Sequence, residues 1–212
     1  TEAGGKPAMT GTSGLLFAVE VVAVLAAAFS GFAESQRKSM DVVGVFTVAF
    51  ITAFGGGTLR DVLLDRRPFF WVEHESYVIL IFALSLVATP IMRHAHRIIP
   101  NAGFIAADAI GLGFFSIVGV SLALEAGMPT FTATMMGVIT GVFGGVLRDV
   151  ILNEVPIVLR DNRPYAITAF IGCWFYVLLR GVGADEALAL WASAGLITVT
   201  RLIAWRRDWS LK

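Results

Sequence analysis

The chain has 212 residues, of which 57% are apolar and only 15% are charged, and its 16 Lys and Arg residues balance its 16 Asp and Glu residues. This zero net charge excludes a basic nucleic-acid-binding domain, and the apolar content excludes an intrinsically disordered chain. A mean hydropathy of +0.78 is too high for one small soluble domain, so we predict a protein that is embedded in a lipid bilayer.

Seven apolar runs follow one another along the chain, and each is close to the roughly 20 residues that cross a bilayer as a helix. They lie at 15–33, 41–64, 76–92, 103–124, 130–152, 164–180 and 187–205. We therefore predict an all-α membrane protein with seven transmembrane helices. Residues 1–12 are small and polar and read as a loose N-terminal tail, and 208–212 form a C-terminal tail.

The positive-inside rule gives the expected orientation. With the N-terminus outside, eleven Lys and Arg residues fall in inner segments and five in outer segments. This asymmetry predicts an outside N-terminus and a cytoplasmic C-terminus.

An internal repeat links the two halves of the chain. Residues 49–68 and 137–156 share ten identities in twenty positions at an offset of 88 residues. Each copy contains three predicted spans, and an odd number of crossings turns the second copy upside down in the membrane. The predicted units are a first three-helix repeat, a second inverted repeat and a seventh helix, at 13–92, 101–180 and 185–207.

Glycines interrupt the second and fifth spans at the same place. The first copy has Gly55, Gly56 and Gly57, and the second has Gly144 and Gly145. Because glycine destabilises a helix interior, we expect a kink at each block that lines a water path. The alternative is close packing of helices through small residues.

A polar stripe follows the same two helices, with a threonine, a glycine and an arginine at i, i+4 and i+8. The stripe is Thr52, Gly56 and Arg60 in the first copy and Thr140, Gly144 and Arg148 in the second. Such a stripe must face another helix or a cavity rather than lipid. Asp61 follows Arg60 and Asp149 follows Arg148, and because adjacent helical residues point about 100° apart, we expect each to pair with a different helix. These four residues are either structural ion-pair clamps or groups near a pore mouth.

Two carboxylates lie clearly inside apolar runs, Glu20 in the first span and Asp108 in the fourth. An ionisable group at that depth must face inward. In inverted repeats the two carboxylates lie toward opposite membrane surfaces, where the two mouths of a cation path would need them. The alternative is that each pairs with Arg60, Arg148 or another arginine.

Enzyme chemistry has no motif in this sequence. One cysteine, Cys173, excludes an intrachain disulfide and a cysteine-based metal site, and the phosphate-loop, dinucleotide-binding and zinc-protease patterns are absent. We expect no enzymatic activity, no cofactor and no metal.

The doubled Gly-Gly-x-Leu-Arg-Asp block, with seven spans in two inverted triplets, resembles the trimeric intracellular cation channel (TRIC) superfamily, and its prokaryotic branch most closely. Phe143 stands where the first copy has Gly55, so the three-glycine pattern is incomplete in the second copy. The resemblance implies a homotrimer in the bacterial plasma (inner) membrane. Each protomer would hold a pore between its first, second, fourth and fifth spans that conducts monovalent cations, potassium more readily than sodium.

Three classes of function fit these features. The first is a cation channel. The second is a secondary transporter of a small solute such as glycine, the activity after which members of the same branch are also described, with Glu20 or Asp108 as the proton-coupling site. The third is a structural membrane protein that conducts nothing. The third and sixth spans carry almost no polar residues at membrane depth, so we expect them to pack outward, against lipid or neighbouring protomers.

Overall fold

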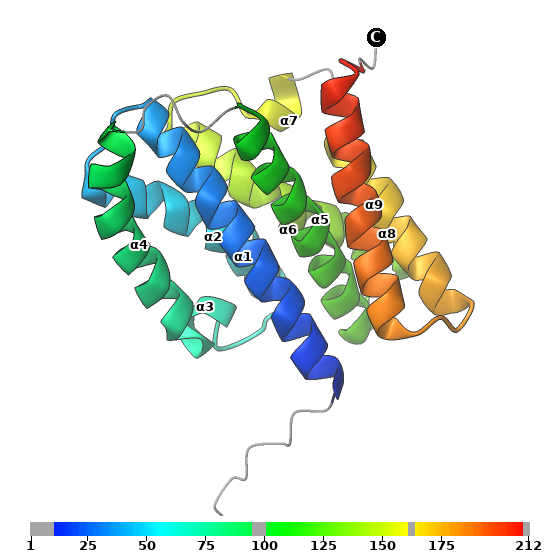
Figure 1. Cartoon of the computed structure of the whole chain (residues 1–212). Coiled ribbons are helices and arrows are strands. Elements are labelled where there is room, and N and C mark those ends of the chain that lie inside the picture. Colours follow the sequence, from blue (N-terminus) through cyan, green and yellow to red (C-terminus); the bar gives the residue numbers. More distant parts are fainter. Residues whose placement is uncertain (1–10, 95–100, 161–163, 210–212) are drawn as a thin grey trace, which may run out of the picture.

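Seven long helices joined by short connections make up most of the chain in the computed structural model (Figure 1). The structure describes residues 11–94, 101–160 and 164–209. Within those ranges it contains no strand, which confirms the predicted all-α class. The long helices are α1 (Gly11–Arg37), α2 (Val42–Leu63), α4 (Glu75–His94), α5 (Asn101–Glu125), α6 (Thr130–Ile151), α8 (Ala166–Gly181) and α9 (Glu186–Arg206).

Each long helix coincides with one predicted apolar run, with ends that differ by a few residues. Two single-turn helices were not predicted, α3 (Phe70–Glu73) and α7 (Ile157–Arg160). Helix α1 begins at Gly11, inside the predicted tail, whereas residues 1–10 and 210–212 lie outside the described ranges.

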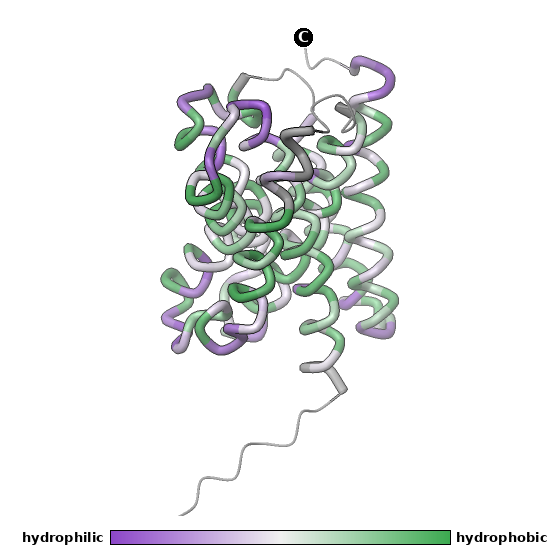
Figure 2. Tube along the Cα trace, turned by 60° about the vertical axis from the view of Figure 1, so that its left-hand side comes forward, coloured by the Kyte–Doolittle hydropathy of each residue, from purple (hydrophilic) through white to green (hydrophobic). Residues whose placement is uncertain are grey.

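The hydropathy of the bundle shows a membrane protein. Five helices, α1, α2, α5, α6 and α9, are long and apolar enough to cross a bilayer, and the apolar parts of α4 and α8 are shorter, Glu75–Val87 and Ala166–Gly181. Hydrophobic residues occupy the middle of the bundle, and hydrophilic residues gather at its two ends (Figure 2). The chain is therefore a multi-pass membrane protein.

Helix α5 is the most buried of these helices and packs against α1, α6, α8 and α9. Helices α1 and α2 pack on each other, and α2 crosses α6. Helix α4 lies against α1 and α2 on one side of the bundle, and α8 lies beside α9 on the other (Figure 1). Both peripheral helices leave apolar side chains uncovered, Ile79 at 61% and Ile171 at 55% exposure. These are the third and sixth apolar runs, and they pack at the periphery.

The connections are set by local chemistry. The Asp41 side chain accepts a hydrogen bond from the Gly44 amide and so caps the start of α2, and Asp185 accepts from the amides of Ala187 and Leu188 at the start of α9. Gly127, between α5 and α6, has a φ of +77°, a conformation that glycine adopts without steric cost. Short connections of this kind place successive helices antiparallel.

Candidate functional site

The two glycine blocks lie where α2 crosses α6. A Cβ added to Gly56 would overlap the backbone carbonyl oxygen of Thr140, and a Cβ added to Gly144 would overlap that of Thr52. The two contacts are equivalent, because Gly144 corresponds to Gly56 and Thr140 to Thr52 at the repeat offset of 88 residues. Glycine is therefore required here for close approach of two backbones.

The predicted break of α2 and α6 at the glycine blocks is wrong. Both helices continue without interruption through 53–59 and 141–147. Gly55 packs against Leu147 of the other helix, so the first block also serves packing. At Gly56 and Gly144, the backbone of the facing helix fills the space that a side chain would occupy. The structure therefore supports the alternative, close packing of helices.

Arg60 lies at the centre of a buried cluster, with 1% of its surface exposed. Its Nη1 donates to Glu20 Oε1 of α1 at 2.9 Å, and its Nε donates to Asp61 Oδ1 at 2.8 Å. The second oxygen of Asp61 accepts the backbone N–H of Phe70, the first residue of α3, at 3.0 Å. Arg60 and Asp61 together thus join α1, α2 and the start of α3.

Arg148 repeats this arrangement at equivalent positions, also with 1% exposure. Its Nη1 donates to Asp108 Oδ1 of α5 at 2.9 Å, and its Nε donates to Asp149 Oδ1 at 2.8 Å. Asp149 Oδ2 accepts the backbone N–H of Ile157, the first residue of α7, at 2.8 Å. The two unpredicted single-turn helices are therefore each tied to a buried aspartate.

The expectation that Arg60 and Arg148 pair with another helix is confirmed, but the expectation that they do so instead of pairing with their neighbouring aspartates is wrong. Each arginine bonds its neighbour through Nε and a carboxylate of another helix through Nη1. A long guanidinium fork reaches both partners, although the Cα–Cβ bonds of adjacent residues diverge. The pairing of Glu20 with Arg60 and of Asp108 with Arg148, which was the alternative for these carboxylates, is present.

The second cluster has additional polar groups. Tyr165 donates its hydroxyl to Asp108 Oδ2 at 2.9 Å, and Arg148 Nη1 also donates to the Ser30 hydroxyl of α1 at 2.6 Å. The guanidinium of Arg201 on α9 lies over the Tyr165 ring, 4.6 Å from its centroid. Asp108 is thus held by two donors and its tyrosine partner is backed by a third helix.

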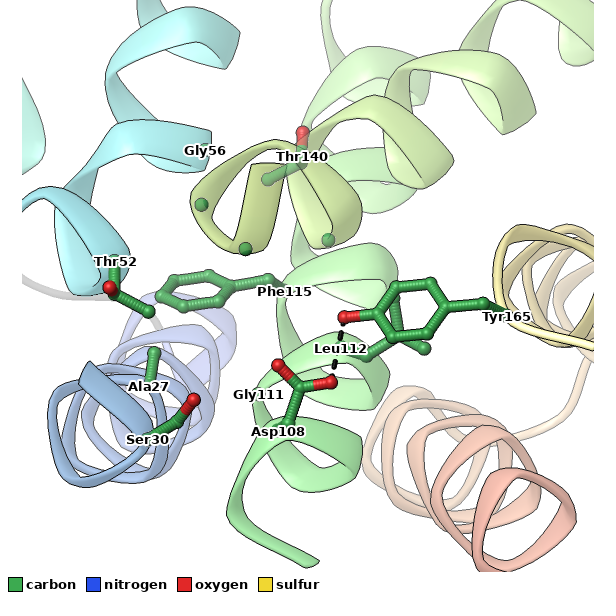
Figure 3. A pocket seen from close by; sticks show the side chains of 13 residues that line it. Ala27, Ser30, Thr52, Gly56, Asp108, Gly111, Leu112, Phe115, Thr140 and Tyr165 are labelled. Carbon is green, nitrogen blue, oxygen red and sulfur yellow. Dashed lines mark hydrogen bonds between the residues drawn. The ribbon is translucent and has the colours of Figure 1, made fainter. Parts of the chain in front are cut away.

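Two small cavities lie inside the bundle, one between α1, α2, α5 and α6 and the other between α1, α2, α3 and α5. The larger, about 20 Å³, borders Asp108 and Tyr165, and it is lined by both crossing threonines and by Ser30 (Figure 3). The smaller, about 10 Å³, borders Glu20 and Arg60. Each has room for about one water-sized particle. The hydroxyls of Thr52 and Thr140 donate to carbonyls of their own helices, so their oxygens remain acceptors.

The structure gathers the predicted residues around these cavities. Nine of them line one cavity or the other: Glu20, Thr52, Gly56, Gly57, Arg60, Asp108, Thr140, Gly144 and Gly145. Asp61, Arg148 and Asp149 bond to lining residues or to one another, and Gly55 packs in the crossing.

Sequence reasoning missed Ser30, Phe115 and Tyr165. Tyr165 had a signal, since it matches Tyr77 at the repeat offset. Phe115 had none, because its counterpart at that offset is Ala27 and a repeat search selects positions that match. Ser30 lacked one too, since its counterpart is Val118.

A family model described as glycine transporter matches the chain twice, at residues 17–93 and 105–181. The second match begins and ends 88 residues after the first, which is the offset of the internal repeat.

Curated relatives are bacterial membrane proteins. The UPF0126 inner membrane protein YadS of Escherichia coli K12 is 36% identical over 158 residues, covering 74% of this chain and 75% of the relative. A UPF0126 membrane protein of Vibrio cholerae is 35% identical over 201 residues, covering 93% and 82%.

Solved structures with the same fold are cation channels by description. The TRIC trimeric intracellular cation channel orthologue from Rhodobacter sphaeroides superposes with a TM-score of 0.81 at 33% identity, covering 92% of this chain and 98% of that one. A prokaryotic TRIC channel in 0.5 M KCl superposes with a TM-score of 0.83 at 26% identity, covering 93% and 98%.

Proposed function

Because the chain belongs to the family that the glycine-transporter model describes, in the TRIC superfamily, we propose that it is a cation channel with a pore inside each protomer. The pore runs between α1, α2, α5 and α6 and conducts monovalent cations, potassium more readily than sodium. It binds no cofactor and catalyses no reaction.

The observation that carries this proposal is a pair of small cavities inside the bundle, one between α1, α2, α5 and α6 and the other between α1, α2, α3 and α5. A buried carboxylate borders each cavity, Glu20 at one and Asp108 at the other. Threonine, serine and tyrosine hydroxyls line the larger cavity, and oxygen ligands suit hard monovalent cations. Each buried cluster holds two carboxylates and one arginine, so its charge favours cations over anions at both cavities.

We propose that the two repeats are inverted and that seven helices cross the membrane. Support comes from contacts that recur 88 residues apart, Arg60 with Glu20 and Arg148 with Asp108. Helices α3 and α7 occupy opposite ends of the bundle, as a two-fold axis in the membrane plane requires (Figure 1). The repeats then span 13–92 and 101–180, and 185–207 add the seventh helix.

The C-terminal end of α9 lies on the cytoplasmic side in this proposal. The described basic side chains outside the helix interiors favour this side: Arg37, Lys38, Arg206 and Arg207 lie at that end, and Arg66, Arg67 and Arg180 at the other. Arg60, Arg148 and Arg201, counted as loop charges in the sequence, are buried at 1% exposure and do not bear on orientation. Lys38 pairs with Glu154 at the same end, joining the connections that follow α1 and α6.

We also propose a homotrimer in the bacterial plasma membrane. The E. coli relative is named an inner membrane protein, and the Rhodobacter structure is described as trimeric. The uncovered apolar side chains of α4 and α8 suit contact with lipid or with neighbouring protomers.

A transporter of glycine is the second candidate, because the family model carries that description. In the described conformation the two cavities are of water size, so a site for glycine would have to form by a further opening. The cavities therefore favour small cations.

Parallel assays on purified protein in liposomes separate the candidates. We expect rapid dissipation of a potassium gradient, slower dissipation of a sodium gradient, and no uptake of radiolabelled glycine above that of empty liposomes. Glycine uptake that depends on a proton gradient, without independent potassium flux, would replace the channel with the transporter.

A further inference from the structure

The two cavities meet at one side chain. Phe115 of α5 lines both of them, and among the described residues that line them it is the only one the two share. Its ring is 6% exposed and points from α5 toward Thr52, with Ala27 of α1 beside it (Figure 3). The Phe115 ring therefore lies at the boundary between the Glu20 cavity and the Asp108 cavity.

The neighbouring route between the cavities is closed by backbone. At the crossing of α2 and α6, the Gly56 and Gly144 backbones lie against the carbonyls of Thr140 and Thr52. Opening there would require two helices to separate. Moving one aromatic side chain, by contrast, changes its χ angles and needs only local repacking of the side chains around it.

Only the second repeat carries a phenylalanine at this position. Position 115 corresponds to position 27 at the repeat offset, and alanine occupies it. Ala27 lines the Asp108 cavity, so its methyl group stands where a second ring would otherwise narrow the path. At this position the pseudo-two-fold symmetry is therefore broken by an apolar ring that only the second repeat carries.

We propose that Phe115 is the gate of the conduction path, closed when its ring separates the two cavities and open when the ring turns aside. An apolar constriction in a conduction path blocks ions because water leaves it, so an ion would have to cross it without hydration. This inference rests on the proposed channel function and assigns the residue that limits it.

Potassium flux from liposomes and single-channel currents test the gate in Phe115→Ala and Phe115→Leu. We expect about a tenfold or larger rise in flux for Phe115→Ala, since about 1.4 kcal/mol removed from a barrier gives a tenfold faster rate. The Leu variant, which keeps most of the apolar volume, should fall between wild type and Ala.

Phe114→Ala is the matched control. Phe114 is also buried on α5, but its ring packs edge-on against Trp191 of α9, with centroids 5.2 Å apart. Loss of this ring should lower the melting temperature as Phe115→Ala does, without raising flux. The double variant Ala27→Phe/Phe115→Ala moves the ring to the equivalent position and should return flux toward the wild-type value.

The outcomes separate the gate from the channel itself. Wild-type currents with an unchanged flux in both Phe115 variants would overturn the gate and leave the channel intact. An equal rise in Phe114→Ala would also overturn it, because general loosening would then explain the leak. Absence of cation flux in wild type and in Phe115→Ala would overturn the channel function and the gate with it.

Discussion

The backbone of Gly56 lies directly against the carbonyl oxygen of Thr140, and Gly144 lies in the same way against the carbonyl of Thr52. The glycine blocks of the two repeats, on α2 and α6, therefore pack directly against each other. The same two threonines face the larger cavity, so the contact that holds α2 and α6 together also sets the dimensions of the proposed path.

Adding a methyl group at this crossing should destabilise the bundle. Gly56→Ala and Gly144→Ala place a Cβ on a backbone carbonyl, and forced overpacking costs about 1–3 kcal/mol. Gly195→Ala on α9 is the control, because no atom lies within 4 Å of its added Cβ. We expect lower melting temperatures in detergent for the first two variants and an unchanged melting temperature for the third. Equal values for all three would show that the crossing is looser than described.

The sequence predicted most successfully the positions of the long helices and the repeated charged residues inside them. Apolar length located all seven long helices, and the repeat selected Glu20, Arg60, Asp108 and Arg148, which the structure brings together in two clusters. An intramembrane charge needs a partner, and the repeat supplied an arginine and a carboxylate of opposite charge in each copy.

The remaining features depend on tertiary contacts that local propensity does not encode. Glycine weakens an isolated helix, but in the bundle the facing backbone replaces the missing side chain, so α2 and α6 stay continuous. The helical starts at Phe70 and Ile157 depend on Asp61 and Asp149, eight or nine residues away.

The buried aspartates should hold the single-turn helices in place. In Asp61→Asn the amide has one acceptor oxygen, so it loses either the Arg60 or the Phe70 hydrogen bond. We expect faster hydrogen exchange across 70–74 and a lower melting temperature. Asp65→Asn, at an exposed position that follows α2, should change neither quantity. Unaltered exchange in Asp61→Asn would mean that α3 is held by its apolar contacts alone.

Neutralising the cavity carboxylates tests their part in conduction. Glu20→Gln and Asp108→Asn should lower unit conductance, more so at low salt, where a fixed charge concentrates cations most strongly. Both variants also leave a buried arginine with one partner fewer, so the melting temperature should fall. Glu73→Gln, which changes an exposed carboxylate on α3, is the control. A lowered melting temperature with unchanged current would return that carboxylate to a purely structural role.

The orientation can be checked with fusions at the C-terminus. The basic end of α9 predicts that a reporter placed after Lys212 is active only if it functions in the cytoplasm. Activity of a reporter that functions only after export would reverse the proposed topology.

Single-channel recording of the purified wild-type protein in a planar bilayer, with potassium chloride on both sides, tests the central claim most directly. The account predicts discrete unit currents of picoampere size that reverse at the potassium equilibrium potential when a potassium gradient is imposed, because alternating-access cycles turn over too slowly to give such currents. Bilayers that contain folded protein and show no unit currents, while the same preparation accumulates glycine in liposomes, would contradict it.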